Sequence, residues 1–230
     1  MSLTNEQQEQ LRLVLAHEYR RCDQAFLDFL DHSTNQLGLG WSKENALSTY
    51  DSYARFLHHL YEFYVGCFKR NKDSLVRISH TELDDLFQTE AEKIMGLHRW
   101  RIERGDADKL ENHISYYETP VPEEFAIDFR QTRNRIAHTD LRRSGANDAL
   151  TLPEFFEKHH KFILILYEEP YGLWHVRAES YDWGEIEKFG KTVNKRTSNQ
   201  NSLSIKEKVS NFIFYGKIKK AIFSRRKNGS

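Results

Sequence analysis

Residues 53–64, YARFLHHLYEFY, carry the pattern that decides the fold class of this chain. Their large apolar side chains recur three and four positions apart, which is the spacing of one face of an α-helix. Six residues form this aromatic stripe: Tyr53, Phe56, Leu57, Leu60, Tyr61 and Tyr64. Ser42 is a good N-cap, so we expect a helix from just after Ser42 to about Arg70, with the stripe in the core.

Helical periodicity extends to four further segments. We expect helices at about residues 5–32, 79–103, 122–138 and 153–167, with a break at residues 36–40. A short strand is expected at residues 171–178, and the Ser/Asn-rich residues 197–204 indicate a linker. Residues 104–121 are polar and are expected to be irregular. The sequence therefore predicts an all-α helical bundle of about five main helices, followed by a basic helical extension.

The last turns of the fourth expected helix contain residues 133–138, RNRIAH. Arg133 can hold a phosphate through a planar fork of donors, and His138 can move a proton near neutral pH. Asn134 can orient either group by hydrogen bonds. The three side chains fit the acid/base chemistry of phosphodiester cleavage. The competing interpretation is a polar helix end whose histidine caps backbone carbonyls.

The same helix has a second pattern, which predicts the face that it buries. Phe125, Phe129, Thr132 and Ile136 recur at helical spacing, so we expect them to face the core. On an ideal helix, five residues turn by about 500°, which leaves Arg133 and His138 about 140° apart. Either the helix ends or distorts before His138, or Arg133 acts together with the motif of a second chain.

The amino-acid composition limits the classes of protein to which this chain can belong. The chain has 230 residues, of which 39% are hydrophobic and 13% aromatic, and it has only 4 prolines, so wholesale disorder is excluded. Cys22 and Cys67 fit neither a disulfide framework nor a metal-ligand spacing, which suggests a reducing compartment. The polar N-terminus has no apolar run that could be a signal or membrane span. We therefore expect a cytoplasmic protein.

The net charge of zero hides an asymmetry between the two ends of the chain. Residues 187–230 contain 12 Lys and Arg against 2 Asp and Glu, whereas residues 1–186 contain 22 against 32. We therefore expect a helical bundle domain over residues 1–186 and a basic linker with an amphipathic segment over residues 187–230. The amphipathic part, residues 205–223, could grip RNA, lie on a membrane surface, or dock on a partner or on the acidic body. We favour docking or nucleic acid, because nothing else in the sequence suggests a membrane.

An Arg-Asn-x-x-x-His motif near the end of one bundle helix, followed by a loop and another amphipathic helix, resembles the HEPN superfamily. The resemblance covers residues 43–168. It implies a metal-independent endoribonuclease without a cofactor, in which the 2′-hydroxyl of the RNA attacks the neighbouring phosphorus. His138 would be the acid or base, Arg133 would stabilise charge on the phosphoryl oxygens, and Asn134 would position His138 or the phosphate.

The resemblance also implies partners. Family members commonly form homodimers whose motifs face one composite cleft, and many act in toxin–antitoxin or antiviral defence systems, so a regulatory or antitoxin partner is expected. Four nearby arginines are candidates for binding the RNA backbone: Arg130, Arg135, Arg142 and Arg143. Two alternatives remain open. One is a HEPN-type module that binds RNA, nucleotides or proteins without catalysis, and the other is a helical adaptor that acts through its basic tail.

Two histidine clusters invite a metal interpretation, which we disfavour. Glu157 and His160 form one Glu-x-x-His element, of which the bundle di-iron sites need two copies, and the sequence has no second copy. His58, His59 and Glu62 have ligand-compatible spacing but lack a full ligand set. We expect no metal site, and we expect Glu62 to be a hydrogen-bonding group.

Overall fold

The computed structural model describes residues 2–109, 111–137, 150–180 and 184–201, and within these residues every regular element is a helix. The predicted all-α fold is confirmed. The helices are α1 (Asn5–Leu39), α2 (Lys43–Asn71), α3 (His80–Glu103), α4 (Ile114–Glu118), α5 (Phe125–Ala137), α6 (Leu152–Ser180) and α7 (Gly184–Asn201). The chain forms two compact units, Met1–Tyr181 and Asp182–Ser230, so α1 to α6 belong to the first unit and α7 to the second.

Side-chain caps begin the three long N-terminal helices. The Thr4 hydroxyl accepts from the Gln7 backbone N–H at 3.2 Å, and the Gln7 side chain accepts from the Thr4 N–H at 3.0 Å. Ser42 and Ser79 accept from the third helical N–H of α2 and α3 at 3.1 and 3.2 Å. Each cap satisfies a donor that has no partner within its own helix, so the polar residue fixes where the helix starts. The sequence predicted the Ser42 cap and left the start of α3 open between Ser79 and Thr81, of which Ser79 is the cap.

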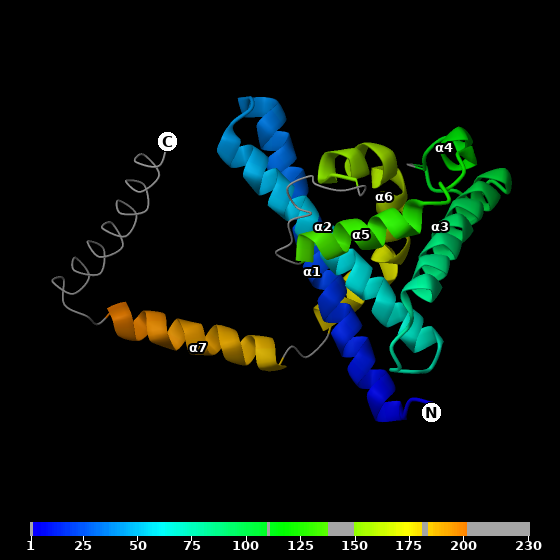
Figure 1. Cartoon of the computed structure of the whole chain (residues 1–230). Helices are drawn as coiled ribbons and strands as arrows, with labels where there is room; N and C mark the ends of the chain where they lie inside the picture. Colours follow the sequence, from blue (N-terminus) through cyan, green and yellow to red (C-terminus); the bar gives the residue numbers. More distant parts are fainter. Residues whose placement is uncertain (1, 110, 138–149, 181–183, 202–230) are drawn as a thin grey trace. The chain divides into compact units, whose positions relative to one another are not determined.

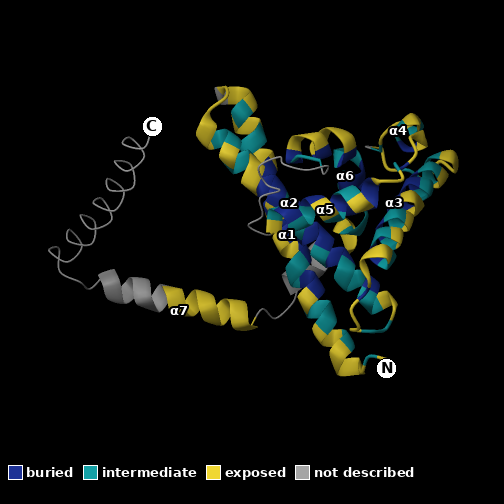
Figure 2. Ribbon diagram, in the orientation of Figure 1, coloured by how far each residue is buried: buried dark blue, intermediate teal, exposed yellow. Residues whose placement is uncertain are grey.

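In the first unit, α1 and α2 form a long antiparallel pair, and α5 lies across α2 and also contacts α3 and α6 (Figure 1). Buried residues gather where these helices meet, whereas the outer ends of α1 and α2 are exposed (Figure 2). The largest fully buried side chains include Tyr19, Phe56, Phe63, Phe87, Phe125, Phe129 and Phe155. All six residues of the predicted aromatic stripe on α2 are buried. This aromatic core holds α5, which carries the motif, in a fixed position.

Proline at position 170 lies inside α6, where it cannot donate the usual hydrogen bond to the carbonyl of Leu166. The hydroxyl of Tyr64 donates to that carbonyl at 2.7 Å, and the hydroxyl of Tyr19 donates to the next carbonyl, that of Tyr167, at 3.1 Å. Tyr167 in turn donates to buried Asp23 at 2.6 Å. Two tyrosines from α1 and α2 therefore supply hydrogen bonds around the proline, which lets α6 continue to Ser180.

Replacing Tyr64 with phenylalanine is expected to lower the free energy of unfolding by about 1–3 kcal/mol, because the buried carbonyl of Leu166 then has neither the hydroxyl nor the proline as a donor. Urea denaturation followed by circular dichroism measures the change. Tyr50→Phe is the matched control, since Tyr50 is 43% exposed and loses little. Equal stabilities of the two variants would show that Tyr64 does not compensate for the proline.

Several boundary predictions are wrong. The first helix continues through Gly38 to Leu39, the expected strand at residues 171–178 lies within α6, and residues 197–201 of the expected linker lie within α7. Extending an existing helix adds one hydrogen bond for each residue fixed, whereas starting a helix is the costly step, so these unfavourable residues do not end the helices. The short α4 also lies in a stretch expected to be irregular. Residues 205–223 of the expected basic helix lie outside the described residues.

Candidate functional site

The burial of α5 decides which way the motif faces. Phe125, Phe129 and Thr132 are buried as predicted, whereas Ile136 is only partly buried. The helix begins at Phe125, whose backbone N–H donates to Pro122 at 3.0 Å, so it starts three residues later than expected. With this face in the core, Arg133 and Asn134 lie at the edge of α5 that meets α2, where both are partly exposed.

The guanidinium of Arg133 is held on three sides. One nitrogen donates to the Asn134 side-chain oxygen at 2.9 Å, and another donates to the carboxylate of Glu62 on α2. The guanidinium carbon lies 5.4 Å from the ring centroid of Tyr61, within the range of a cation–π contact. The Arg133 side chain is 20% exposed, so it is fixed in direction yet still open to solvent. Glu62 is thus a hydrogen-bonding group, as the sequence predicted.

Two buried nitrogen atoms in this arrangement have no hydrogen-bond partner among the described residues, namely Nε of Arg133 and Nδ1 of His58. Burial, followed by the positive charge of Arg133, lowers the pKa of His58 below its ordinary value. The imidazole is therefore neutral at pH 7, which is the form that can accept a proton.

A hollow of about 540 Å³ lies beside this cluster. His58 lines it from α2, together with Tyr50, Asp51 and Arg55, and Ile136 and Ala137 line it from the last turn of α5. Ala137 directly precedes His138 in the sequence. From the sequence alone, His58 is a candidate only for metal binding. Its spacing of four residues from Glu62 puts both on one face of α2, but only the crossing of α5 over that face brings them next to Arg133.

The structure places the other predicted site residues differently. Arg130 donates both arms of its fork to Asp84 at 2.8 and 2.9 Å, and buried Arg135 donates to the carbonyl of Leu150. These two guanidinium groups are engaged within the protein. His138, Arg142 and Arg143 lie outside the described residues.

A second, smaller hollow of about 170 Å³ is lined by Arg133 itself. Arg133 and Asn134 line it from α5, Tyr61 and Lys69 line it from α2, and Arg77 lines it from the segment before α3. Burial, followed by the charge of Asp84, raises the pKa of Tyr61 to about 12, so its hydroxyl keeps its proton at neutral pH. Residues of the motif therefore line two hollows, one with a histidine and one that is rich in positive charge.

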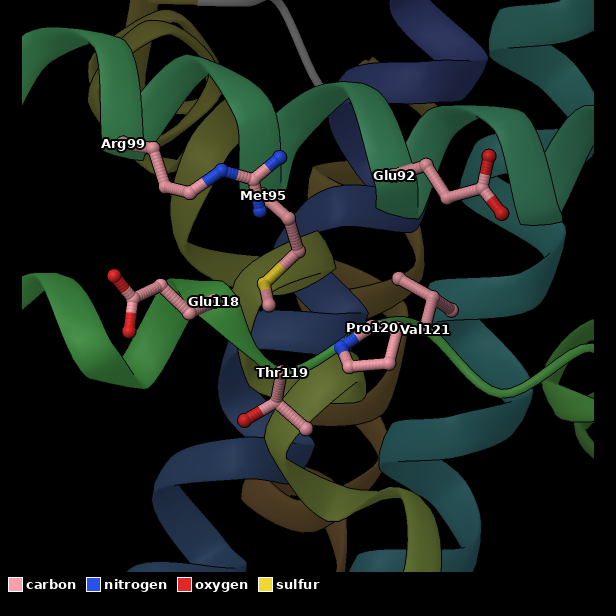
Figure 3. Close-up of a pocket in the computed structure, with 7 residues that line it drawn as sticks. All are labelled: Glu92, Met95, Arg99, Glu118, Thr119, Pro120 and Val121. Carbon is pink, nitrogen blue, oxygen red and sulfur yellow. The ribbon is translucent and has the colours of Figure 1, made fainter.

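A third hollow, of about 490 Å³, contains no residue of the motif in its lining (Figure 3). Glu92, Met95 and Arg99 reach it from α3, and residues 118–121 close its other side. Arg99 donates to the carbonyl of Tyr117, which occupies part of its donor capacity. The lining has two carboxylates and no histidine, so it offers no acid/base pair near neutral pH.

Two of the histidines that were weighed as metal ligands in the sequence make other contacts. The Nδ1 atom of His160 lies 3.0 Å from the hydroxyl of Tyr53, and that of His59 lies 2.6 Å from Glu18. Within residues 2–109, 111–137, 150–180 and 184–201, no group of three His, Cys, Asp or Glu residues could hold a metal ion. None of the helices in these ranges has the length and apolar content needed to cross a membrane.

The α2–α5 cluster combines a guanidinium, an amide and a neutral imidazole, which are groups that can stabilise negative charge and transfer protons. Comparisons with protein-family models, with curated proteins and with solved structures gave no match, so the function is argued from this geometry.

Proposed function

We propose that this protein is a metal-independent endoribonuclease of HEPN type, with its active site where the end of α5 crosses α2. The observation that carries the proposal is the Arg133–Asn134 pair. Glu62 and Tyr61 hold Arg133 close enough to His58 for its charge to act on the imidazole, and His58 lines the larger hollow together with Ile136 and Ala137. A guanidinium fixed in this way can receive negative charge without reorganising during the reaction.

In the proposed reaction, the 2′-oxygen of a ribose attacks the adjacent phosphorus. A base takes the proton from the 2′-hydroxyl as the new oxygen–phosphorus bond forms. The bond from phosphorus to the 5′-oxygen breaks, and an acid gives that oxygen a proton. The products are a 2′,3′-cyclic phosphate and a 5′-hydroxyl. No external electron acceptor or donor is needed, because the step only exchanges one oxygen on phosphorus for another.

His138 serves as the acid or base, and Arg133 stabilises the charge on the phosphoryl oxygens. Asn134 positions the phosphate: its side-chain oxygen already accepts from Arg133, which leaves its amide N–H groups to donate. His58 supplies a second imidazole on the facing helix, in its neutral form. His58 and His138 together provide the separate acid and base that the reaction requires.

The partners follow from the same proposal. RNA is the substrate, and the acting species is a homodimer in which the same patch of each chain meets its copy across a two-fold axis. Such a dimer also places the His138 of one chain near the Arg133 of the other, which relieves the helical separation of these residues within one chain. An antitoxin or other regulatory protein would control the activity, as in the systems that the resemblance implies.

The proposal predicts that the purified protein cleaves mixed RNA in the presence of EDTA and leaves 2′,3′-cyclic phosphate and 5′-hydroxyl ends. Mapping the ends of the products measures both features. An RNA whose 2′-hydroxyls are methylated is the matched control, and it should remain intact because it lacks the nucleophile. A strict requirement for a divalent metal, or products with 3′-hydroxyl ends, would contradict the mechanism.

The same assay separates the alternatives. Binding of RNA without cleavage would favour the non-catalytic HEPN-type module. If a chain that ends at residue 201 loses all RNA binding, the basic segment carries the interaction and the adaptor interpretation gains support.

A further inference from the structure

The smaller hollow beside Arg133, which we name the basic hollow, has an unbalanced set of charges. Lys69, Arg77, Arg130 and Arg133 line it, and Glu62 is the one acidic residue in its lining. Glu62 pairs with Arg133, and Asp84, which lies outside the lining, pairs with Arg130. Lys69 and Arg77 have no ion-pair partner in the described part of the chain. Two positive charges therefore remain uncompensated at the hollow.

The elements around the basic hollow hold these charges at separate points of its wall. Lys69 projects from the last turns of α2, and Arg77 lies on the segment that leads to the N-cap of α3. Arg133 lines the hollow from α5, and its Nε atom is buried without a partner among the described residues. Donors that converge from three segments are suited to a ligand with several acceptor oxygens on one centre.

Size and charge limit the ligand. Pockets for whole drug-sized molecules measure about 300–1,000 Å³, and the basic hollow, at about 170 Å³, is smaller. It can admit a phosphate group while the attached nucleoside stays outside. A phosphate monoester carries about 1.5 to 2 negative charges at pH 7, which matches two unpaired cations. An internal phosphodiester carries one charge and has two of its oxygens bonded to carbon.

We propose that the basic hollow binds a terminal phosphate monoester, with Lys69 and Arg77 as the residues that select it. The source is either the phosphorylated end of an RNA or a free nucleoside monophosphate. The inference rests on the proposed function only in one respect, namely that RNA is one of the two sources of the phosphate. The hollow would seat a chain end next to the cleavage site, because Arg133 and Asn134 belong to both places.

The test uses the full chain with His138→Ala, so that RNA is not consumed during a titration. Three probes are compared at fixed salt by calorimetry: one oligoribonucleotide with a 5′-phosphate, the same oligoribonucleotide with a 5′-hydroxyl, and adenosine 5′-monophosphate. We expect the phosphorylated oligoribonucleotide to bind at least about tenfold more tightly than its hydroxyl counterpart, since a hydrogen bond to a charged group contributes on that scale. Tight binding of the mononucleotide would identify the free nucleotide as the source.

Lys69→Gln and Arg77→Gln should each reduce the preference for the phosphorylated probe. Arg70→Gln is the matched control, because Arg70 follows Lys69 on α2 and does not line the hollow. It should weaken binding of both oligoribonucleotides alike and leave the preference unchanged. Equal affinity for both oligoribonucleotides together with no binding of the mononucleotide would overturn the inference. If the protein prefers the 5′-phosphorylated probe but cleaves no RNA, the proposed nuclease function is wrong and the phosphate site still stands.

Discussion

Replacing His138 with alanine is expected to slow RNA cleavage by about 10²–10⁴-fold, which is the contribution of one general acid or base. RNA affinity should change little, because the phosphate contacts assigned to Arg133 and Asn134 remain. In the sequence, His138 lies off the apolar stripe formed by Phe125, Phe129 and Thr132, so the variant should keep its fold. Single-turnover cleavage with the enzyme in excess separates the chemical step from binding.

His32→Ala is the control for this experiment, since His32 lies on α1, far from the motif in the sequence, and lines neither of the hollows beside the motif. It should cleave RNA at the rate of the unchanged protein. The pH profile gives a second readout, because loss of His138 should remove one limb of the dependence of rate on pH. A His138→Ala variant with unaltered rate and profile would exclude this residue from the chemistry and would leave His58 as the imidazole to test.

The Phe129→Ala variant is expected to lose about 3–5 kcal/mol of stability, which is a large part of the total for a domain of this size. Phe129 is fully buried, and its ring contacts those of Tyr61, Phe87, Phe125 and Phe155. The cavity would lie directly beneath Arg133, so cleavage should also fall as α5 loosens. Urea denaturation gives the free energy of unfolding, and the activity assay gives the second effect.

Ile127→Ala is the matched control, because Ile127 lies on the same helix and is 40% exposed. It removes a smaller apolar side chain without leaving a buried cavity and should cost less than about 1 kcal/mol. If both variants were equally stable, the central aromatic cluster would not be what fixes α5 against α2.

Sequence patterns correctly predicted the features that depend on residues close together in the chain, such as helix faces and helix caps. The stripe on α2 and the caps Ser42 and Ser79 depend only on residues within a few turns, and the structure has them where the sequence indicated. The course of α6 could not be predicted in this way. Pro170 is unfavourable inside a helix, and the hydroxyl groups of Tyr19 and Tyr64 that compensate for it come from distant segments.

In the candidate site, too, contacts between sequence neighbours could be predicted and contacts between distant residues could not. Arg133 and Asn134 are neighbours in the sequence, so their pairing could be anticipated from the motif. The contact between Arg133 and Glu62 joins residues 71 positions apart, and it exists only because α5 crosses α2 at that level. Lys69 and Arg77 gave no motif, since they belong to different elements that meet only in the folded chain. Helix faces can be predicted from periodicity, but the register between two helices depends on tertiary packing.

The buried hydrogen bond between Asp23 and Tyr167 also sets an order of events during synthesis. The two residues are 144 positions apart, and the hydroxyl of Tyr19 also finds its acceptor, the carbonyl of Tyr167, in this part of α6. At a translation rate of about 5–20 residues per second, α1 emerges roughly 7–30 s before its partner. During that interval, α1 and α2 can pair while Asp23 stays hydrated. The nascent chain therefore completes its core only when the last helix of the first unit arrives, and a ribosome that stalls before Tyr167 leaves an unclosed bundle that chaperones and proteases can recognise.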